Sequence, residues 1–186
     1  MSHRIAVAVT LCAALLLGIP AAADPYDDFD ALFPLGKPAC FTRVYDADHM
    51  QAHPQQTVTS LRLARGYPEL LYEDDIDKPP AREDRRAKIE VIATFRDSGK
   101  VGNSKRFAGG AGCYVSVDAI HCSSDNCNGG GFSVLREPTG TILIKLQNNG
   151  WFSLRGSCGA EDARSLAHGA DDLTFRLAPS PMVACR

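Results

Sequence analysis

Lys88-Ile89-Glu90-Val91-Ile92-Ala93-Thr94-Phe95-Arg96 is the stretch that decides the fold, because apolar and polar side chains alternate along it. A strand directs successive side chains to opposite faces, so a period of two predicts a strand whose face of Ile89, Val91, Ala93 and Phe95 lies in a core. The same alternation indicates strands in 57–63, 113–117, 132–136, 142–146, 151–155 and 173–177, and residues 40–45 have the composition of a first strand.

Short turn sequences separate these segments, as in Asp97-Ser98-Gly99, Glu137-Pro138-Thr139-Gly140 and Asn148-Asn149-Gly150. Strands joined by such turns pair as antiparallel neighbours, so residues 88–155 are predicted to form one continuous meander. Seven or eight strands must bury one face and protect their edges. The predicted fold is therefore all-β, a small antiparallel meander that closes into a barrel, with a two-sheet sandwich or a trefoil as the alternative.

The first 23 residues have the three parts of a secretory signal peptide. Arg4 precedes an apolar run over 5–19, and small residues lead up to Ala23. The run of about 15 residues is shorter than the roughly 20 that a membrane span needs. Cys12 lies inside the run rather than at its end, which argues against a lipid anchor. We therefore predict cleavage after Ala23 and a periplasmic or secreted product.

Length and charge narrow the class of protein further. Removal of the leader leaves 163 of the 186 residues, which suits one domain. Arg4 is the only Lys or Arg in the leader, so 19 basic residues remain against 22 acidic residues, a net charge of −3 with both signs scattered. A nucleic-acid binder would need a basic face, so this class is disfavoured. No later stretch is long and apolar enough to predict a membrane span.

Six of the seven cysteines follow the leader, an even number in an oxidising setting. We expect three disulfides, although six cysteines permit 15 connectivities. The preferred pairing is Cys40 with Cys185, Cys113 with Cys122, and Cys127 with Cys158. A metal site is the alternative, but Cys122 and Cys127 are spaced more widely than in zinc knuckles, and no His follows at finger spacing.

The chain is expected to contain an N-terminal arm and one domain. Residues 24–39 mix acidic and aromatic side chains between prolines without periodicity, which indicates an arm that lies on the domain or frays. Residues 40–186 are predicted to form a single disulfide-stabilised β domain. One short helix is expected near 46–53, because an Asp at its start can accept amide hydrogens and a Pro follows its end. Acidic residues, two prolines and then arginines indicate a charged loop over 69–87.

His49 and His53 are four residues apart on the predicted helix, so both rings could meet one metal ion. Asp46 could add an oxygen ligand, and the set would suit copper, zinc or nickel. Met50 stands where a metalloprotease helix carries Glu, and short His pairs occur by chance. We therefore expect no cofactor and keep these three residues as weak metal candidates.

Residues 122–132 have the most unusual local composition, with three consecutive glycines beside Asp and Asn side chains. The segment matches neither an EF-hand loop nor a phosphate loop. Its plain interpretation is a disulfide-pinned turn that enters a strand, and its functional interpretation is a recognition loop for a sugar or a protein. Trp151 could stack on such a ligand, although a core position is the favoured interpretation. The candidate ligand-binding residues are Asp125, Asn126, Asn128, Phe132 and Trp151.

The sequence offers little for catalysis, because it lacks a Gly-x-Ser-x-Gly motif and the predicted disulfides use every cysteine after the leader. The expected function is that of an exported soluble module that binds a protein or small ligand without catalysis. In size, predicted export and strand content the chain is similar to bacterial periplasmic inhibitors of proteases or lysozymes, a similarity of architecture only. The alternative is a metal-binding protein or hydrolase that uses His49, His53 and nearby carboxylates.

Overall fold

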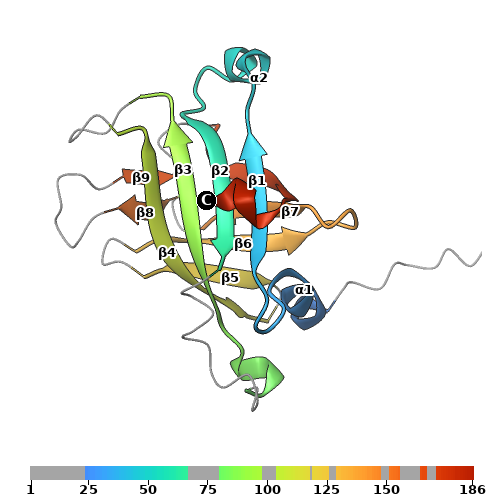
Figure 1. The fold of residues 1–186 in the computed structure, drawn as a ribbon. Helices are drawn as coiled ribbons and strands as arrows, with labels where there is room; N and C mark the ends of the chain where they lie inside the picture. Colours follow the sequence, from blue (N-terminus) through green and yellow to red (C-terminus); the bar gives the residue numbers. More distant parts are fainter. Residues whose placement is uncertain are drawn as a thin grey trace, which may run out of the picture.

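The fold is known from a computed structural model, shown as a ribbon in Figure 1. It describes residues 24–66, 80–97, 104–117, 119–125, 129–147, 151–155, 164–166 and 171–186. The predicted leader and the predicted Cys127–Cys158 disulfide lie outside the described residues.

Eight strands form a closed antiparallel barrel in the order β1-β10-β7-β6-β5-β4-β3-β2 (Figure 1). A separate two-stranded sheet consists of β8 and β9. The strands are β1 (Ala39–Val44), β2 (Val58–Arg65), β3 (Ala87–Phe95), β4 (Arg106–Val115), β5 (Ile120–Ser124), β6 (Gly131–Arg136), β7 (Ile142–Leu146), β8 (Phe152–Arg155), β9 (Arg164–Leu166) and β10 (Thr174–Pro179). The predicted all-β barrel is confirmed.

The segment that predicted the fold is β3, and its apolar face lies in the core as expected. Ile89, Val91, Ala93 and Phe95 are all buried within one continuous apolar cluster that fills the barrel. The Phe95 ring packs edge-on against the Phe107 ring of β4, with centroids 5.8 Å apart. The apolar side chains that alternate along β3 therefore form part of the inner face of the barrel.

The predicted meander over 88–155 is correct only as far as β7. β7 pairs with β6 and with β10, whereas β8 pairs with β9, so the expected β7–β8 hairpin is wrong. Gly109 of β4 is paired with Val91, whose side chain is in the core, so the missing side chain of Gly109 would point inward. A Cβ there would lie 2.5 Å from the Leu154 carbonyl oxygen. β8 thus crosses the inner side of β4, which only a glycine permits.

Within residues 24–39, for which we predicted an arm without regular structure, the structure has a helix, α1 (Pro25–Leu32). Asp24 caps it by accepting the Tyr26 amide at 2.9 Å, and Pro25 occupies the first helical position, where a missing amide costs nothing. Phe29 and Leu32 pack into the barrel core, so α1 covers the end of the barrel away from the second helix (Figure 1). No helix among the described residues is long and apolar enough to cross a bilayer.

The predicted short helix is confirmed as α2 (Ala47–Ala52), which Asp46 caps by accepting the His49 amide at 2.8 Å. Two 3-10 turns complete the described elements, η2 (Arg82–Asp84) and η3 (Met182–Cys185). η2 lies in the described part of the predicted charged loop, where Arg82 pairs with Asp24 and Asp27 of the α1 region. These ion pairs are exposed, so each adds little to stability.

Two of the three predicted disulfides are confirmed. Cys40 of β1 is bonded to Cys185 of η3 across a sequence separation of 145 residues. Cys113 and Cys122 are bonded across facing positions of β4 and β5, with a separation of 9 residues. The first disulfide therefore joins the two ends of the barrel domain, and the second staples a hairpin that is already paired.

Replacement of Phe95 by Ala should lower the free energy of unfolding by about 3 to 5 kcal/mol, because the ring is fully buried and leaves a cavity. Chemical denaturation of the oxidised protein measures the loss. The matched control is Thr94→Ala on the opposite face of β3, which should cost less than about 1 kcal/mol. Equal losses in the two variants would show that the inner face of β3 is wrongly assigned.

Candidate functional site

The candidate site lies where β1 meets β10, a junction that we call the seam. β1 pairs with β2 at six positions, but with β10 only through Phe41 with Pro179 and Thr42 with Ala178. Beside that short ladder, the Ser180 amide donates to the Cys40 carbonyl at 2.8 Å. Beyond Thr42 the β1–β10 ladder ends, so this part of the barrel wall has no backbone pairing across the seam.

Arg43 marks the opening of the seam. It is paired with Leu61 of β2, whose side chain is fully buried, so both side chains leave the sheet on its inner side. Arg43 is nevertheless exposed. An inward-facing residue can reach solvent only where the neighbouring strand does not cover it, which is the consequence of the ladder that ends at Thr42.

A pocket of about 370 Å³ occupies the opening. Its walls come from β1, α2, β7 and β10, which are distant in sequence. The lining residues are Arg43, Tyr45, His49, Leu143, Thr174 and Arg176. Two guanidinium groups, a phenol and an imidazole therefore share one opening with a single aliphatic side chain.

Stacked rings connect β1 to α2 at this pocket. The Arg43 guanidinium lies over the Tyr45 ring at 5.1 Å from its centroid. The Tyr45 ring stacks on His49 at 4.6 Å, and His49 stacks on His53 at 4.4 Å. His49 Nε2 also lies 2.9 Å from Gln56 Oε1, which holds the imidazole in place. The aromatic wall is thus ordered by its own contacts.

Burial raises the pKa of the Tyr45 phenol above its ordinary value of 10.0. The Arg43 charge opposes this shift, and the Asp172 carboxylate adds to it. Asp172 is fully buried and accepts hydrogen bonds from the amides of Thr57 and Val58, at 2.8 and 3.2 Å. The Asp172 carboxylate therefore binds the backbone at the start of β2 and does not line the pocket.

The predicted metal ligands come together only in part. His49 and His53 are neighbours, but their rings stack with an interplanar angle of 26°. Ring nitrogen lone pairs lie in the ring planes, so nearly parallel rings do not aim them at one point. The Asp46 carboxylate is used as the α2 cap, and the described residues hold no group of three His, Cys, Asp or Glu side chains that could bind a metal.

The predicted ligand loop has a mainly structural explanation. The Gly131 amide donates to the Trp151 carbonyl at 3.2 Å, and the Ser153 amide donates to the Gly129 carbonyl at 3.3 Å. Gly130 has a φ of 84°, and a Cβ there would collide with the Trp151 carbonyl oxygen. The glycine run therefore lets the chain that enters β8 pack backbone to backbone on the β5–β6 edge.

The proposed ligand residues divide between surface and core. Phe132 is fully buried and packs edge-on against Phe152, so its assignment to a ligand surface is wrong. Trp151 is 36% exposed, so the favoured core position for this residue is also wrong. The Asp125 amide bonds to the Gly110 carbonyl at 3.0 Å, and its carboxylate lies over Gly110 of β4. Asn126 and Asn128 lie outside the described residues.

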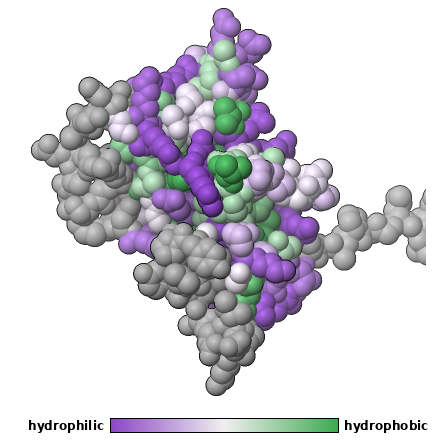
Figure 2. Space-filling model, viewed as in Figure 1, coloured by the Kyte–Doolittle hydropathy of each residue, from purple (hydrophilic) through white to green (hydrophobic). Residues whose placement is uncertain are grey.

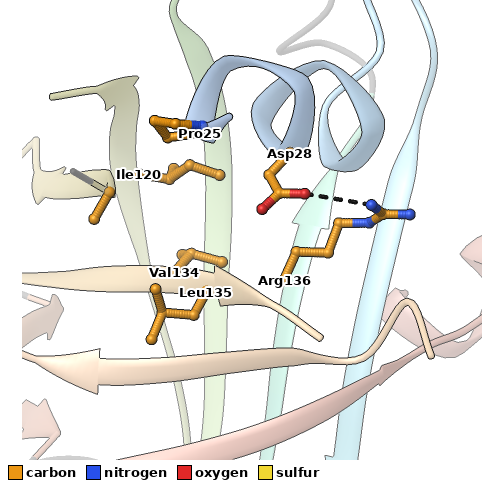
Figure 3. A pocket seen from close by; sticks show the side chains of 7 residues that line it. Pro25, Asp28, Ile120, Val134, Leu135 and Arg136 are labelled. Atoms are coloured by element: carbon orange, nitrogen blue, oxygen red, sulfur yellow. Dashed lines mark hydrogen bonds and ion pairs between the residues drawn. The ribbon is translucent and has the colours of Figure 1, made fainter. Parts of the chain in front are cut away.

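A second cavity of about 220 Å³ lies between α1 and the β5–β6 part of the barrel (Figure 3). Asp28 and Arg136 face each other across it at 3.3 Å (Figure 3). Ile120 and Val134 form part of its apolar wall. Its two charged groups pair with each other, so this cavity offers a ligand fewer unpaired charges than the pocket at the opening of the seam, which we call the seam pocket.

Comparison of the chain with protein-family models, with curated proteins and with solved structures finds no match.

The raised pKa of Tyr45 predicts a specific alkaline behaviour. The folded protein holds the phenol proton more tightly than the unfolded chain, so this contribution to stability is complete below pH 10.0 and is lost as pH rises through the higher folded pKa. Ultraviolet absorbance of phenolate should show that Tyr45→Phe removes a late component of the titration. If Tyr45→Phe instead removed a component that titrates at or below pH 10.0, the buried environment assigned to the Tyr45 phenol would be contradicted.

Proposed function

We propose that the chain is an exported, non-enzymatic module that binds a protein or a small ligand on the outside of its barrel. The seam pocket carries this proposal, because it is a polar opening where the two-pair β1–β10 ladder ends among the described residues. Binding sites are commonly held at such edges and loops by a rigid scaffold. The disulfides and the signal-like first 23 residues support export.

The filled barrel favours an outer site over an inner one. Inward side chains of all eight strands join α1 and β8 in one apolar cluster. Small barrels are either filled by side chains or hollow around a ligand, and this interior is filled over the described residues. A ligand would therefore be held at the wall of the barrel rather than inside it.

Binding without catalysis has more support than the metal-dependent or hydrolytic alternative. A nucleophile needs a base within hydrogen-bond reach, and a metal needs converging ligands. His49 and His53 stack instead of converging, and the Asp46 carboxylate caps α2. The chemistry-bearing side chains of α2 are thus already used to build the wall of the pocket.

The experiment is affinity capture with the oxidised chain that starts at Asp24, immobilised at its C-terminus. The probe is an extract of exported proteins and small molecules from the native cells. The matched control is the same chain after reduction and alkylation, which lacks the Cys40–Cys185 bond. We expect saturable enrichment of a ligand by the oxidised chain only, with the ligand recovered chemically unchanged. Equal enrichment by both forms, or conversion of the ligand, would contradict the proposal.

A further inference from the structure

We infer that the seam pocket binds a carboxylate group, with Arg43 as the main binding residue; this inference rests on the proposed function and names the chemistry of its ligand. The pocket combines two arginines with a phenol and a threonine hydroxyl. Its donors outnumber its acceptors, which is the condition for holding an anion.

Arg43 is the strongest unmatched donor. Its guanidinium stacks on Tyr45 and makes no hydrogen bond or ion pair with any residue that the structure describes. Stacking leaves the edge of the guanidinium plane open, and that edge carries five N–H groups. Paired N–H groups on this edge match the two oxygens of a carboxylate, which makes Arg the usual residue for such recognition.

Two further donors face the same opening. The Tyr45 hydroxyl and the Thr174 hydroxyl have no hydrogen-bond partner among the described residues. A phenol of ordinary pKa is already protonated at neutral pH, and burial raises the pKa of Tyr45 further, so this hydroxyl is a donor. Neither hydroxyl is among the buried polar atoms that lack a partner, so both are open to solvent, and an oxygen of a bound ligand could take the place of water as their acceptor.

The charge of the pocket is only partly neutralised from within. Arg176 pairs with Glu137 at 2.8 Å, and the Arg176 side chain is 65% exposed. Asp172 influences Tyr45, but its oxygens accept bonds from Thr57 and Val58. Within the described ranges, Arg176 therefore has a carboxylate partner and Arg43 has none, so Arg43 can accept a carboxylate from a ligand.

The shape of the pocket favours a carboxylate on a short carbon chain. Leu143 and the Tyr45 ring form an apolar wall next to the donors, and this wall suits methylene groups. On the face drawn in Figure 2, the coloured surface mixes hydrophilic and hydrophobic residues. In the pocket itself two arginines and two hydroxyls stand beside one leucine, so recognition by charge fits this pocket better than recognition by an apolar face.

Such a carboxylate has two sources, a free small dicarboxylic acid or an acidic side chain of a protein. Two probes distinguish them. The first is succinate, and the second is a peptide of four Glu residues with blocked termini. Isothermal titration calorimetry at low ionic strength measures the affinity of each probe for the oxidised chain, and inorganic phosphate serves as a comparison anion.

Binding of at least one probe should depend on Arg43. Arg43→Ala should weaken binding by roughly 10- to 100-fold, because it removes charge-assisted hydrogen bonds. Arg43→Lys should restore only part of the affinity, since an ammonium group lacks the paired N–H edge. The matched control is Arg106→Ala, which removes the same charge from an exposed position on β4 and should leave the affinity unchanged. Unchanged thermal unfolding of each variant shows that folding is intact.

Three results would overturn the inference: no heat of binding from either carboxylate probe, equal weakening by Arg43→Ala and Arg106→Ala, or phosphate binding as tight as that of succinate. Affinity capture tests the proposed function separately from the carboxylate site. If the oxidised chain captures a ligand and Arg43→Ala captures the same ligand equally well, the proposed function is retained and the carboxylate site is rejected. If the oxidised chain captures no ligand and neither carboxylate probe binds, both proposals are rejected.

Discussion

The seam between β1 and β10 is the constraint on which the rest of the structure depends. A sheet of eight antiparallel strands exposes two unpaired edges unless its outermost strands meet. Here they meet through Phe41 and Thr42, beside the disulfide between Cys40 and Cys185. That bond spans 145 residues, for which the chain-entropy model gives about 5 kcal/mol of stabilisation. At one end of the seam the chain that follows β10 is therefore tied covalently to β1 through η3, and the other end is left to side chains.

The open end of the seam explains why a charged side chain, Arg43, lines the pocket. Arg43 occupies an inward position of β1, where a barrel would ordinarily carry an apolar residue. Among the residues that the structure describes, this guanidinium makes a stacking contact with Tyr45 and no hydrogen bond or ion pair. Asp172, by contrast, is buried and fully used, because it holds the first amides of β2. A charged group that the fold uses so little is the kind of residue that departs from folding rules for the sake of binding.

The sequence predicts the parts of this protein that depend on neighbours in the chain. Alternation in β3 and the even cysteine number predict the barrel and two of its disulfides. The course of β8 could not be predicted, because it depends on contact between Leu154 and the distant Gly109. α1 could have been found, since Asp24 followed by Pro25 is a helix start. The candidate site was found only through His49, because the role of Arg43 depends on where the β1–β10 ladder ends.

Native-state hydrogen exchange across the seam tests the central claim most directly. The Ser180 amide donates to the Cys40 carbonyl across the seam, whereas the Val91 amide lies in the middle of the continuous sheet. The account predicts that the double variant Cys40→Ala/Cys185→Ala increases exchange at Ser180 far more than at Val91, because the seam opens before the sheet does. An equal increase at both amides, or protection of Ser180 that does not depend on the disulfide, would contradict it.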